Sequence, residues 1–323
     1  MPKASSSVLI IRLDAIGDAL ALTPSIAALQ RAGVPVDLVL RPANAAVFAN
    51  GALRDVVVAG FDLRSRSRTN LAAIAQLGRT LRDRGYTHVL VATEDPGGYR
   101  LAAAIGAPVR AGFEDPWGKP LKAIWSRGLL TRSVYRSAAL KHASAHECET
   151  LFGLVAPLAQ ESAPTRDLER LRPLVLDEAP QPDGRIVVQI SDKWERLGIP
   201  FAQVVDLVRR VAAAGDVHLV ASESETVYAE RIEEATALPV QRFDALPPWK
   251  AAIAAADALI APDSGALHVA GTIGTPVVAV FPPMPRFDAW VARWSPWAAP
   301  HRIVRAGDDR WPARATEALA QLR

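Results

Sequence analysis

The sequence predicts an α/β fold with two Rossmann-like domains that face one another across a cleft. Short apolar runs alternate with helical patterns in both halves of the chain, which is typical of parallel sheets covered by helices. The second half repeats the order of the first, with a strand, a polar loop, a helix and another strand. A proline-rich segment at 156–184 lies between the halves.

The N-terminal half begins with an apolar strand at 8–11 and a polar turn at 14–18. A helix is expected from Ala19 to Ala32, because apolar residues recur at helical spacing before a stop at Gly33. Further strands are expected at 36–40, 55–58 and 88–92, and a further helix at 70–84. This alternation predicts the first parallel sheet.

The C-terminal half begins with strands at 185–190 and 217–221, with a helix between them that ends at Gly215. Two apolar runs, 258–260 and 277–281, read as central strands, and a polar turn and a helix separate them. Ser264 is a good helix N-cap and Gly265 lets a ligand approach the backbone. The free N–H groups of that first turn suit a diphosphate. We expect domains at 1–165 and 185–323 and a linker at 166–184.

Composition indicates a folded protein of two ordinary domains, since 323 residues exceed one small core and half of them are apolar. The single cysteine, Cys148, excludes an internal disulfide framework and a cysteine-based zinc site, which fits a reducing cytoplasm. The N-terminus shows no secretory pattern. The uncharged window at 264–285 contains three glycines and four prolines, which fit a helix, a turn and a strand better than a membrane span.

Two stretches of the chain resemble the bacterial heptosyltransferase family. They are RLDAIGDALALTPSIAAL at 12–29 and APDSGALHVAGTIGTPVVAVFPP at 261–283. The resemblance runs in order along most of the chain, but only these two motifs are specific. It implies the GT-B architecture, with the last helix, expected at 313–322, packing back towards the first domain. It also implies inverting transfer of heptose from an ADP-activated donor to an anionic glycolipid acceptor of the lipopolysaccharide-core type, without a cofactor. The enzyme would be cytoplasmic, with transient contact at the inner membrane surface.

The resemblance assigns the catalytic base to Asp18, the aspartate of the Gly17-Asp18 pair after the first strand. Glycosyl transfer needs such a base for the acceptor hydroxyl. Asp14 is a second candidate. Either aspartate could instead cap the helix expected at 19, a common role for Asp. We favour the base for Asp18 and the cap for Asp14.

The resemblance places the phosphates of the donor at 263–268, and His268 would contact a phosphate or the sugar unless it packs at the domain interface. A lysine is expected in the loop after the first C-domain strand, before a Trp-Pro pair. This chain has Ile199-Pro200 there and Leu197 at the aligned position, so we favour Lys193 over Arg196 as the cation, or else an exposed lysine without a role. The predicted donor-binding residues are Gly17, Lys193, Glu223, Asp263, Ser264, Gly265, Leu267 and His268.

Other acidic and histidine residues have local alternatives. Glu223 and Glu225 follow a strand and suit a nucleotide ribose, or else they are first-turn partners of the helix dipole. His146 and Glu149 match a His-x-x-Glu that opens a helix in the family, and we interpret that pair as structural.

A basic segment without acidic residues lies between Trp117 and Ala145. Its cations are Lys119, Lys122, Arg127, Arg132, Arg136 and Lys141. Such a run is either a solvated helix face or a landing surface for anionic lipids or a phosphorylated acceptor. For the second reading we select Arg132 and Arg136.

Missing motifs exclude several other classes of protein. No strand is followed by Gly-x-Gly-x-x-Gly, and the P-loop motif is absent, which removes dinucleotide oxidoreductases and P-loop ATPases. No signature of a nucleic-acid-binding domain accompanies the basic segment. The absence of Asp-x-Asp agrees with a metal-independent glycosyltransferase. Two alternatives stay open: the same fold with another nucleotide sugar, and a non-catalytic nucleotide-sugar-binding protein, which would not need Asp18.

Overall fold

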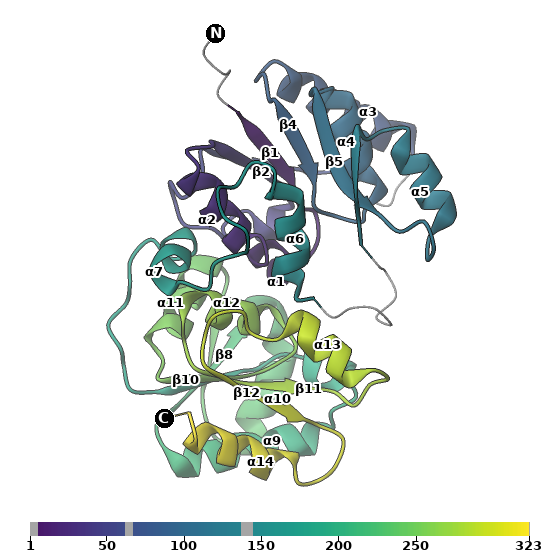
Figure 1. The fold of residues 1–323 in the computed structure, drawn as a ribbon. Coiled ribbons are helices and arrows are strands. Elements are labelled where there is room, and N and C mark those ends of the chain that lie inside the picture. The colour runs from purple at the N-terminus through teal and green to yellow at the C-terminus, as the bar shows by residue number, and fades with distance from the viewer. Residues whose placement is uncertain (1–5, 62–66, 137–144, 323) are drawn as a thin grey trace. The chain divides into compact units, whose positions relative to one another are not determined.

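The computed structural model describes residues 6–61, 67–136 and 145–322. The chain divides into two compact units, Met1–Thr165 and Arg166–Arg323. Each unit contains a six-stranded parallel sheet covered by helices (Figure 1). The predicted α/β fold with two Rossmann-like domains is confirmed.

The sheet of the first unit has the strand order β3-β2-β1-β4-β5-β6. Its strands are β1 (Val8–Ile11), β2 (Val36–Leu40), β3 (Asp55–Val58), β4 (His88–Val91), β5 (Val109–Glu114) and β6 (Arg132–Tyr135). The first strand pairs in parallel with both β2 and β4, so the chain builds the sheet outwards from β1 in two directions. Ligands of such sheets bind at the carboxyl ends of the strands beside this switch point.

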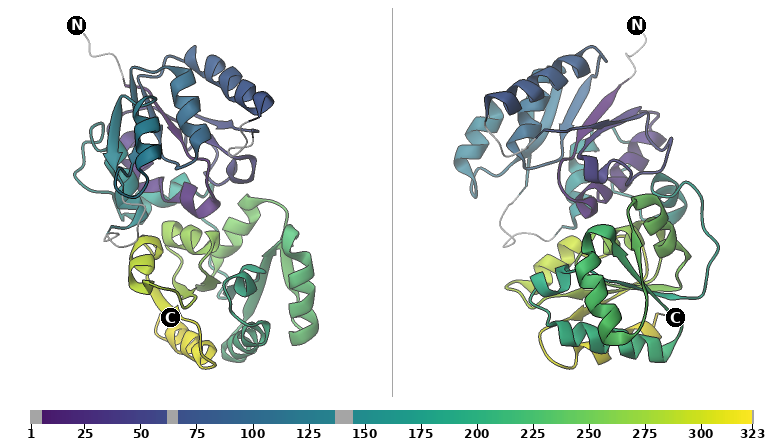
Figure 2. Two further views of the ribbon diagram at one scale, coloured as in Figure 1. Left: turned by 90° about the vertical axis from the view of Figure 1, so that its right-hand side faces the viewer. Right: turned by 180° about the vertical axis from the view of Figure 1, so that it is seen from behind.

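The helices of the first unit cover both faces of its sheet (Figure 2). They are α1 (Ile16–Leu20), α2 (Thr23–Arg31), α3 (Arg68–Arg82), α4 (Pro96–Ile105), α5 (Pro120–Arg127) and α6 (Glu147–Val155), with a 3₁₀ turn η1 (Pro42–Asn44).

The single helix expected at 19–32 is wrong, because α1 begins earlier and the helix breaks at 21–22. Pro24 has no N–H to donate to the carbonyl of Leu20, four residues before it. The hydroxyl of Thr23 donates to that carbonyl instead, at 2.5 Å. The proline therefore starts a new helix in place of continuing the first.

The second unit repeats this strand order as β12-β11-β10-β7-β8-β9. Its strands are β7 (Ile186–Gln189), β8 (Val217–Ser222), β9 (Val240–Phe243), β10 (Ala258–Pro262), β11 (Val277–Phe281) and β12 (His301–Arg305). Read from its other edge, this is the arrangement of the first sheet, with β7 in the place of β1 and β10 in the place of β4. The switch point lies between β7 and β10.

The helices of the second unit surround a core in which Trp194 stacks on Trp311, with ring centroids 5.7 Å apart. They are α7 (Leu168–Leu171), α8 (Lys193–Arg196), α9 (Phe201–Ala214), α10 (Thr226–Thr236), α11 (Leu246–Ala255), α12 (Gly265–Ile273), α13 (Phe287–Trp294) and α14 (Trp311–Ala320), with 3₁₀ turns η3 (Arg172–Leu174) and η4 (Glu223–Glu225). The last helix, α14, packs its buried face on α9 and β12 of its own unit. None of the described helices is long and apolar enough to cross a membrane.

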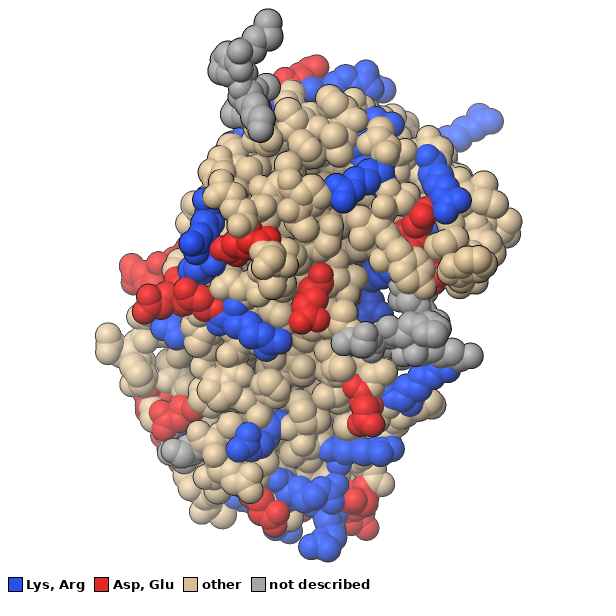
Figure 3. Space-filling view, in the orientation of Figure 1, with Lys and Arg blue, Asp and Glu red and all other residues tan. Residues whose placement is uncertain are grey.

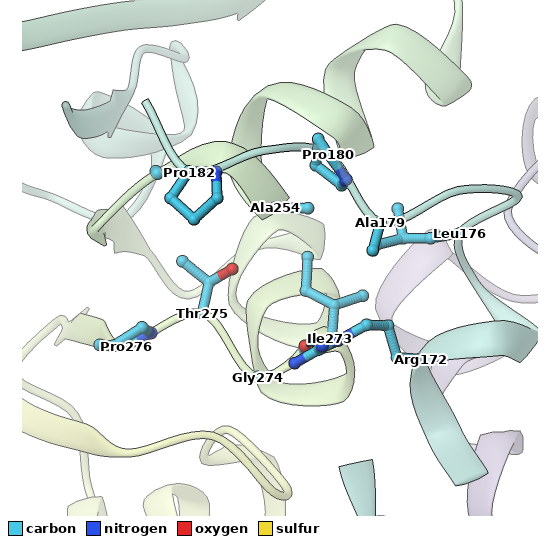
Figure 4. Close-up of a pocket in the computed structure, with 11 residues that line it drawn as sticks. Arg172, Leu176, Ala179, Pro180, Pro182, Ala254, Ile273, Gly274, Thr275 and Pro276 are labelled. Carbon is cyan, nitrogen blue, oxygen red and sulfur yellow. Dashed lines mark hydrogen bonds between the residues drawn. The ribbon is translucent and has the colours of Figure 1, made fainter. Parts of the chain in front are cut away.

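The segment 166–184 carries α7 and η3 and lies in the second unit. Arg172 Nε donates to the carbonyl of Ile273 at 2.8 Å, and Lys250 Nζ donates to the carbonyl of Val175 at 2.7 Å. A cavity of about 200 Å³ lies where this segment passes the C-terminal end of α12, between Pro180, Pro182 and Gly274 (Figure 4). No residue predicted to bind substrate lines this cavity.

Candidate active site

Asp18 lies in α1, directly beyond the carboxyl end of β1. Its Oδ1 accepts a hydrogen bond from Arg12 Nη2 at 2.8 Å, and its Oδ2 accepts from the backbone N–H of Ala15 at 3.1 Å. The side chain is 26% exposed. Asp18 therefore has the cap contact that we considered as its alternative role, and its carboxylate still reaches solvent.

Arg12 is fully buried beside three carboxylates, and no role was predicted for it. Its Nε lies 3.4 Å from Asp14 Oδ2, and its Nη2 lies 3.4 Å from Glu147 Oε1 in addition to its bond with Asp18. Burial opposes the charge of the guanidinium, but the three acids outweigh this effect and raise the pKa of Arg12 above its ordinary value. Arg12 is thus a permanent cation that fixes the base candidate.

Asp14 does not cap the helix, contrary to the role that we favoured for it. The N-cap of α1 is Ala15, and the capping contact comes from Asp18. The Oδ2 atom of Asp14 is buried and accepts no hydrogen bond within the described residues. Burial raises the pKa of the Asp14 carboxyl, although Arg12 acts in the opposite direction. Asp14 therefore remains the second candidate for the base.

Most of the described cations of the basic segment pair with acids from other parts of the chain. Arg136 Nη2 contacts both carboxylate oxygens of the fully buried Glu147, at 2.7 and 2.8 Å, and its side chain is only 8% exposed. Arg136 therefore does not lie on the exposed surface, where the sequence analysis placed it. Lys119 and Lys122 pair with Glu94, and Arg127 with Glu114. Arg132 is exposed and makes no ion pair with any described residue, and Lys141 lies outside the described residues.

The turn between β10 and α12 presents hydrogen-bond donors at the switch point of the second sheet. Ser264 is the N-cap of α12 in an extended conformation, and its Oγ is buried without a partner among the described residues. The first N–H groups of a helix have no partner within the helix, and they carry partial positive charge. The turn therefore presents hydrogen-bond donors and partial positive charge, and Gly265 is the first residue of the helix.

The neighbouring motif residues have defined contacts. Asp263 Oδ2 accepts a hydrogen bond from Trp290 Nε1 at 2.9 Å. The ring of His268 meets the edge of Trp294, with centroids 5.8 Å apart. Leu267 is fully buried, so its side chain belongs to the core. The two tryptophans of α13 were not predicted, because no spacing rule links them to a turn more than twenty residues earlier.

The loops after β7 and β8 meet the same edge of the second sheet. Glu225 accepts hydrogen bonds from Ser191 Oγ and from the backbone N–H of Asp192, both at 2.9 Å, and so closes the loop after β7. Arg196 pairs with Asp192 at 2.6 Å. Lys193, at the start of α8, forms no ion pair with a described residue, which leaves its ammonium group available to a ligand. Glu223 is exposed at the start of η4.

His146 and Glu149 form a capping box, which confirms their structural interpretation. His146 Nδ1 accepts from the N–H of Cys148 at 3.1 Å, and Glu149 Oε2 accepts from the N–H of His146 at 2.9 Å. Gly17 is buried in α1. Among the described residues, no group of three or more His, Cys, Asp or Glu side chains is arranged to hold a metal ion.

Comparison with known proteins finds a family similarity in the second unit. Residues 200–321 match the family model of glycosyltransferase family 9 (heptosyltransferase). Over these residues the chain is similar to glycosyltransferase family 9. This match includes the β10–α12 turn, and it confirms the resemblance to the heptosyltransferase family and the predicted class of enzyme. No curated protein sequence matches the chain.

Solved structures of this family share the fold of the whole chain. A family 9 glycosyltransferase from Veillonella parvula DSM 2008 matches with a TM-score of 0.77 at 16% identity, and the alignment covers 100% of this chain and 98% of that chain. E. coli heptosyltransferase WaaC with ADP has a TM-score of 0.73 at 18% identity, with coverages of 98% and 100%. E. coli ADP-heptose lps heptosyltransferase II has a TM-score of 0.70 at 18% identity, with coverages of 98% and 98%. The architecture is therefore GT-B, as predicted.

Proposed function

We propose that the chain transfers a heptose from an ADP-activated donor to an acceptor of the lipopolysaccharide-core type, with inversion at the anomeric carbon and without a metal ion. The observation that carries this proposal is the buried, unpartnered hydroxyl of Ser264 at the N-terminus of α12. A buried polar group without a partner is costly, so its presence beside free helix N–H groups favours an anionic ligand there.

In the proposed reaction, Asp18 accepts the proton of the acceptor hydroxyl. The acceptor oxygen attacks the anomeric carbon on the face opposite the diphosphate, and the bond from that carbon to the diphosphate oxygen breaks. The new glycosidic bond therefore has the inverted configuration. Arg12 keeps the Asp18 carboxylate in place through its bond at 2.8 Å, and about a quarter of the side chain stays open to the substrate.

The second unit stabilises the departing diphosphate in this proposal. The N–H groups of α12 and the Ser264 hydroxyl donate to the phosphate oxygens, and the Lys193 ammonium adds a full positive charge. Such donors stabilise the transition state because negative charge grows on the leaving group as the bond breaks. Glu223 would accept from the hydroxyls of the ribose.

The ADP-heptose donor and the acceptor class are supported by similarity to other proteins. Heptosyltransferase WaaC was solved with ADP, and a second structure of similar fold is named as an ADP-heptose lps heptosyltransferase. Because the identities are only 18%, these names support the choice of donor for this chain without deciding it. We also propose a cytoplasmic location with transient contact at the inner membrane surface, as the resemblance of the two sequence motifs implies.

A thermal-shift screen of nucleoside diphosphates tests the proposal. ADP should raise the unfolding temperature more than UDP or GDP, because a ligand at 100 times its Kd stabilises the folded state by about 2.7 kcal/mol. A preference for UDP or GDP would move the assignment to another nucleotide sugar. No shift with any of the three would contradict a nucleotide-sugar site.

A further inference from the structure

The face of α5 that points away from the first sheet is apolar and exposed. Trp117, just before the helix, is 87% exposed, Leu121 is 83% exposed and Ile124 is 68% exposed. On the opposite face, Ala123 and Ser126 are buried against the unit. Leu121 and Ile124 are three residues apart in α5 and share its exposed face, and Trp117 lies in the turn that leads into the helix; we call these three residues the apolar stripe. Water-exposed stripes of large apolar residues mark binding surfaces.

Basic residues lie close to this stripe along the chain. Lys119 and Arg127 flank it on the helix, and Arg132 of β6 is exposed nearby along the chain without an ion pair to a described residue. Two of these cations have acidic partners, Glu94 and Glu114, but the surface as a whole keeps an excess of positive charge. In Figure 3 the surface around α5, at the upper right, is largely uncharged with charged side chains along its border.

A groove continues the apolar stripe towards α4. Its volume is about 410 Å³, and it is lined by Pro96, Arg100, Leu121, Lys122 and Trp125. The guanidinium of Arg100 lies over the Trp125 ring, 5.2 Å from its centroid. Two cations therefore stand at the rim of a groove with mainly apolar walls, which is a combination that suits a lipid with an anionic headgroup.

We propose that this α5 face binds the surface of an anionic phospholipid bilayer. Trp117, Leu121 and Ile124 enter the boundary between headgroups and acyl chains, where tryptophan is enriched. The surrounding lysines and arginines contact the phosphates, as in other amphipathic helices that lie in the plane of a membrane.

This surface lies at the same sheet edge as Asp18. Lys119 and Lys122 of the α5 region pair with Glu94, which follows β4, and Arg136 bridges Glu94 and Glu147. A bilayer on α5 would therefore present lipid-linked groups at the edge that carries the base candidate. This consequence rests on the proposed function, whereas the membrane contact itself does not.

Co-sedimentation of the full chain with lipid vesicles tests the proposal. The parent protein should sediment with phosphatidylcholine vesicles that contain phosphatidylglycerol, and less with phosphatidylcholine alone. A Leu121→Ser/Ile124→Ser variant should lose about tenfold or more in partitioning, since it removes two large apolar side chains from the contact. The matched control is Val227→Ser, a residue of α10 in the second unit that is 74% exposed, and it should sediment like the parent.

Folding and donor binding are measured on the same variants. All three replaced side chains are exposed, so their unfolding temperatures should stay close to that of the parent, and calorimetry should find an unchanged ADP affinity. Equal sedimentation of the parent and the double variant, or no binding by the parent at low ionic strength, would overturn the proposal. A dimer that the double variant abolishes while vesicle binding persists would assign the stripe to a second copy of the chain, and would also overturn it. Failure of the parent to bind ADP would contradict the proposed function and leave the vesicle result unaffected.

Discussion

Asp18 combines two properties that a helix cap alone does not need. Its carboxylate is fixed by Arg12, a residue whose own charge is secured by three surrounding acids, and it remains partly exposed at the switch point of the first sheet. Burying an arginine costs free energy because its guanidinium loses contact with water, and the surrounding acids must offset that cost. A residue that only caps a helix does not need such a partner. The arrangement is better explained by an aspartate that must be held ready for substrate.

We expect Asp18→Asn to lower the turnover number by about 10²-fold or more, the usual effect of losing a general base. The amide keeps the shape and can still accept from Arg12, so the affinity for ADP should not change. Steady-state rates with a nucleotide-heptose donor, together with calorimetry, measure the two quantities. Asp14→Asn is the comparison: near-normal rates for Asp18→Asn together with a large loss for Asp14→Asn would move the base to Asp14.

Arg132 and Arg136, at the two ends of β6, should differ in how much they contribute to stability. Arg136→Ala should lower the free energy of unfolding by about 3 kcal/mol, because it removes both short contacts to the buried Glu147 carboxylate, at 2.7 and 2.8 Å. Arg132→Ala should stay within about 0.5 kcal/mol of the parent, as surface changes usually do. Urea unfolding measures both. Similar values for the two variants would show that the Glu147 pair contributes no net stability.

The sequence could propose Asp18 and the 263–268 turn as site residues because each is a short motif whose residues are neighbours along the chain. It did not locate Arg12 or the true environment of Arg136, because their shared partner Glu147 is far from Arg12 along the chain and could not be paired by spacing. The acid-free run at 117–145 looked like an exposed patch for the same reason. The acids that pair with its cations lie outside the run, since Glu94 and Glu114 precede it and Glu147 follows it.

At the scale of the element, the β10–α12 unit follows directly from its sequence. Two apolar strands bracket a serine N-cap and a helix that ends at Gly274 in the left-handed conformation, as a helix C-cap often does. The α1–α2 break was missed because the prediction followed the apolar spacing, which continues on both sides of Pro24. The hydroxyl of Thr23 replaces the bond that Pro24 cannot make, and this replacement is visible only in the structure.

Gly265→Val should weaken ADP binding strongly while leaving the fold largely intact, because a side chain at the first position of α12 stands where the diphosphate must approach. Calorimetry with ADP alone measures the effect. The matched control is Gly60→Val, since a Cβ at Gly60 would meet no atom within 4 Å and its φ is not in the left-handed region. Unchanged ADP affinity in the Gly265 variant would remove the phosphate site from this turn.

A pH-dependent prediction concerns Lys250 of α11, which joins the 166–184 segment to the second unit. Burial lowers the pKa of this ammonium group to about 8. Between about pH 8 and the ordinary lysine value near 10.4, the unfolded chain binds a proton that the folded chain has released, so stability should rise with pH across this window. Lys250→Met lacks this group and should lack the rise.

Denaturant unfolding of both proteins at pH 7 to 10 measures this effect. The free energy of unfolding of the parent minus that of Lys250→Met should increase with pH above about 8. Other titrating groups act alike in both proteins and cancel in the difference. A difference that stays constant with pH would mean that the folded protein keeps Lys250 protonated throughout.

At the scale of the whole molecule, the two sheets share one strand order, in which the chain builds outwards from β1 in the first unit and from β7 in the second. The repeated order of strands and helices in the sequence predicted that the two sheets would be alike, because short crossovers between parallel strands permit few strand orders. The sequence could not show how the segment 166–184 is used. Its prolines suggested a linker, but the hydrogen bonds of Arg172 with Ile273 and of Lys250 with Val175 join it to the second unit.

Negative charge develops on the diphosphate as it leaves, and the protein must neutralise this charge. In the proposed reaction this charge is met by the N-terminus of α12, by the Ser264 hydroxyl and by Lys193, so a metal ion has no necessary part. Transfer should therefore proceed at the same rate with a chelator as with added magnesium. Lys193→Ala should weaken donor binding and slow transfer in the presence of chelator. The guanidinium of Arg196 is exposed and already paired with Asp192, so Arg196→Ala should have little effect on donor binding or on the rate of transfer. Activity that the chelator abolishes and magnesium restores would show that a metal ion neutralises the diphosphate in place of these groups.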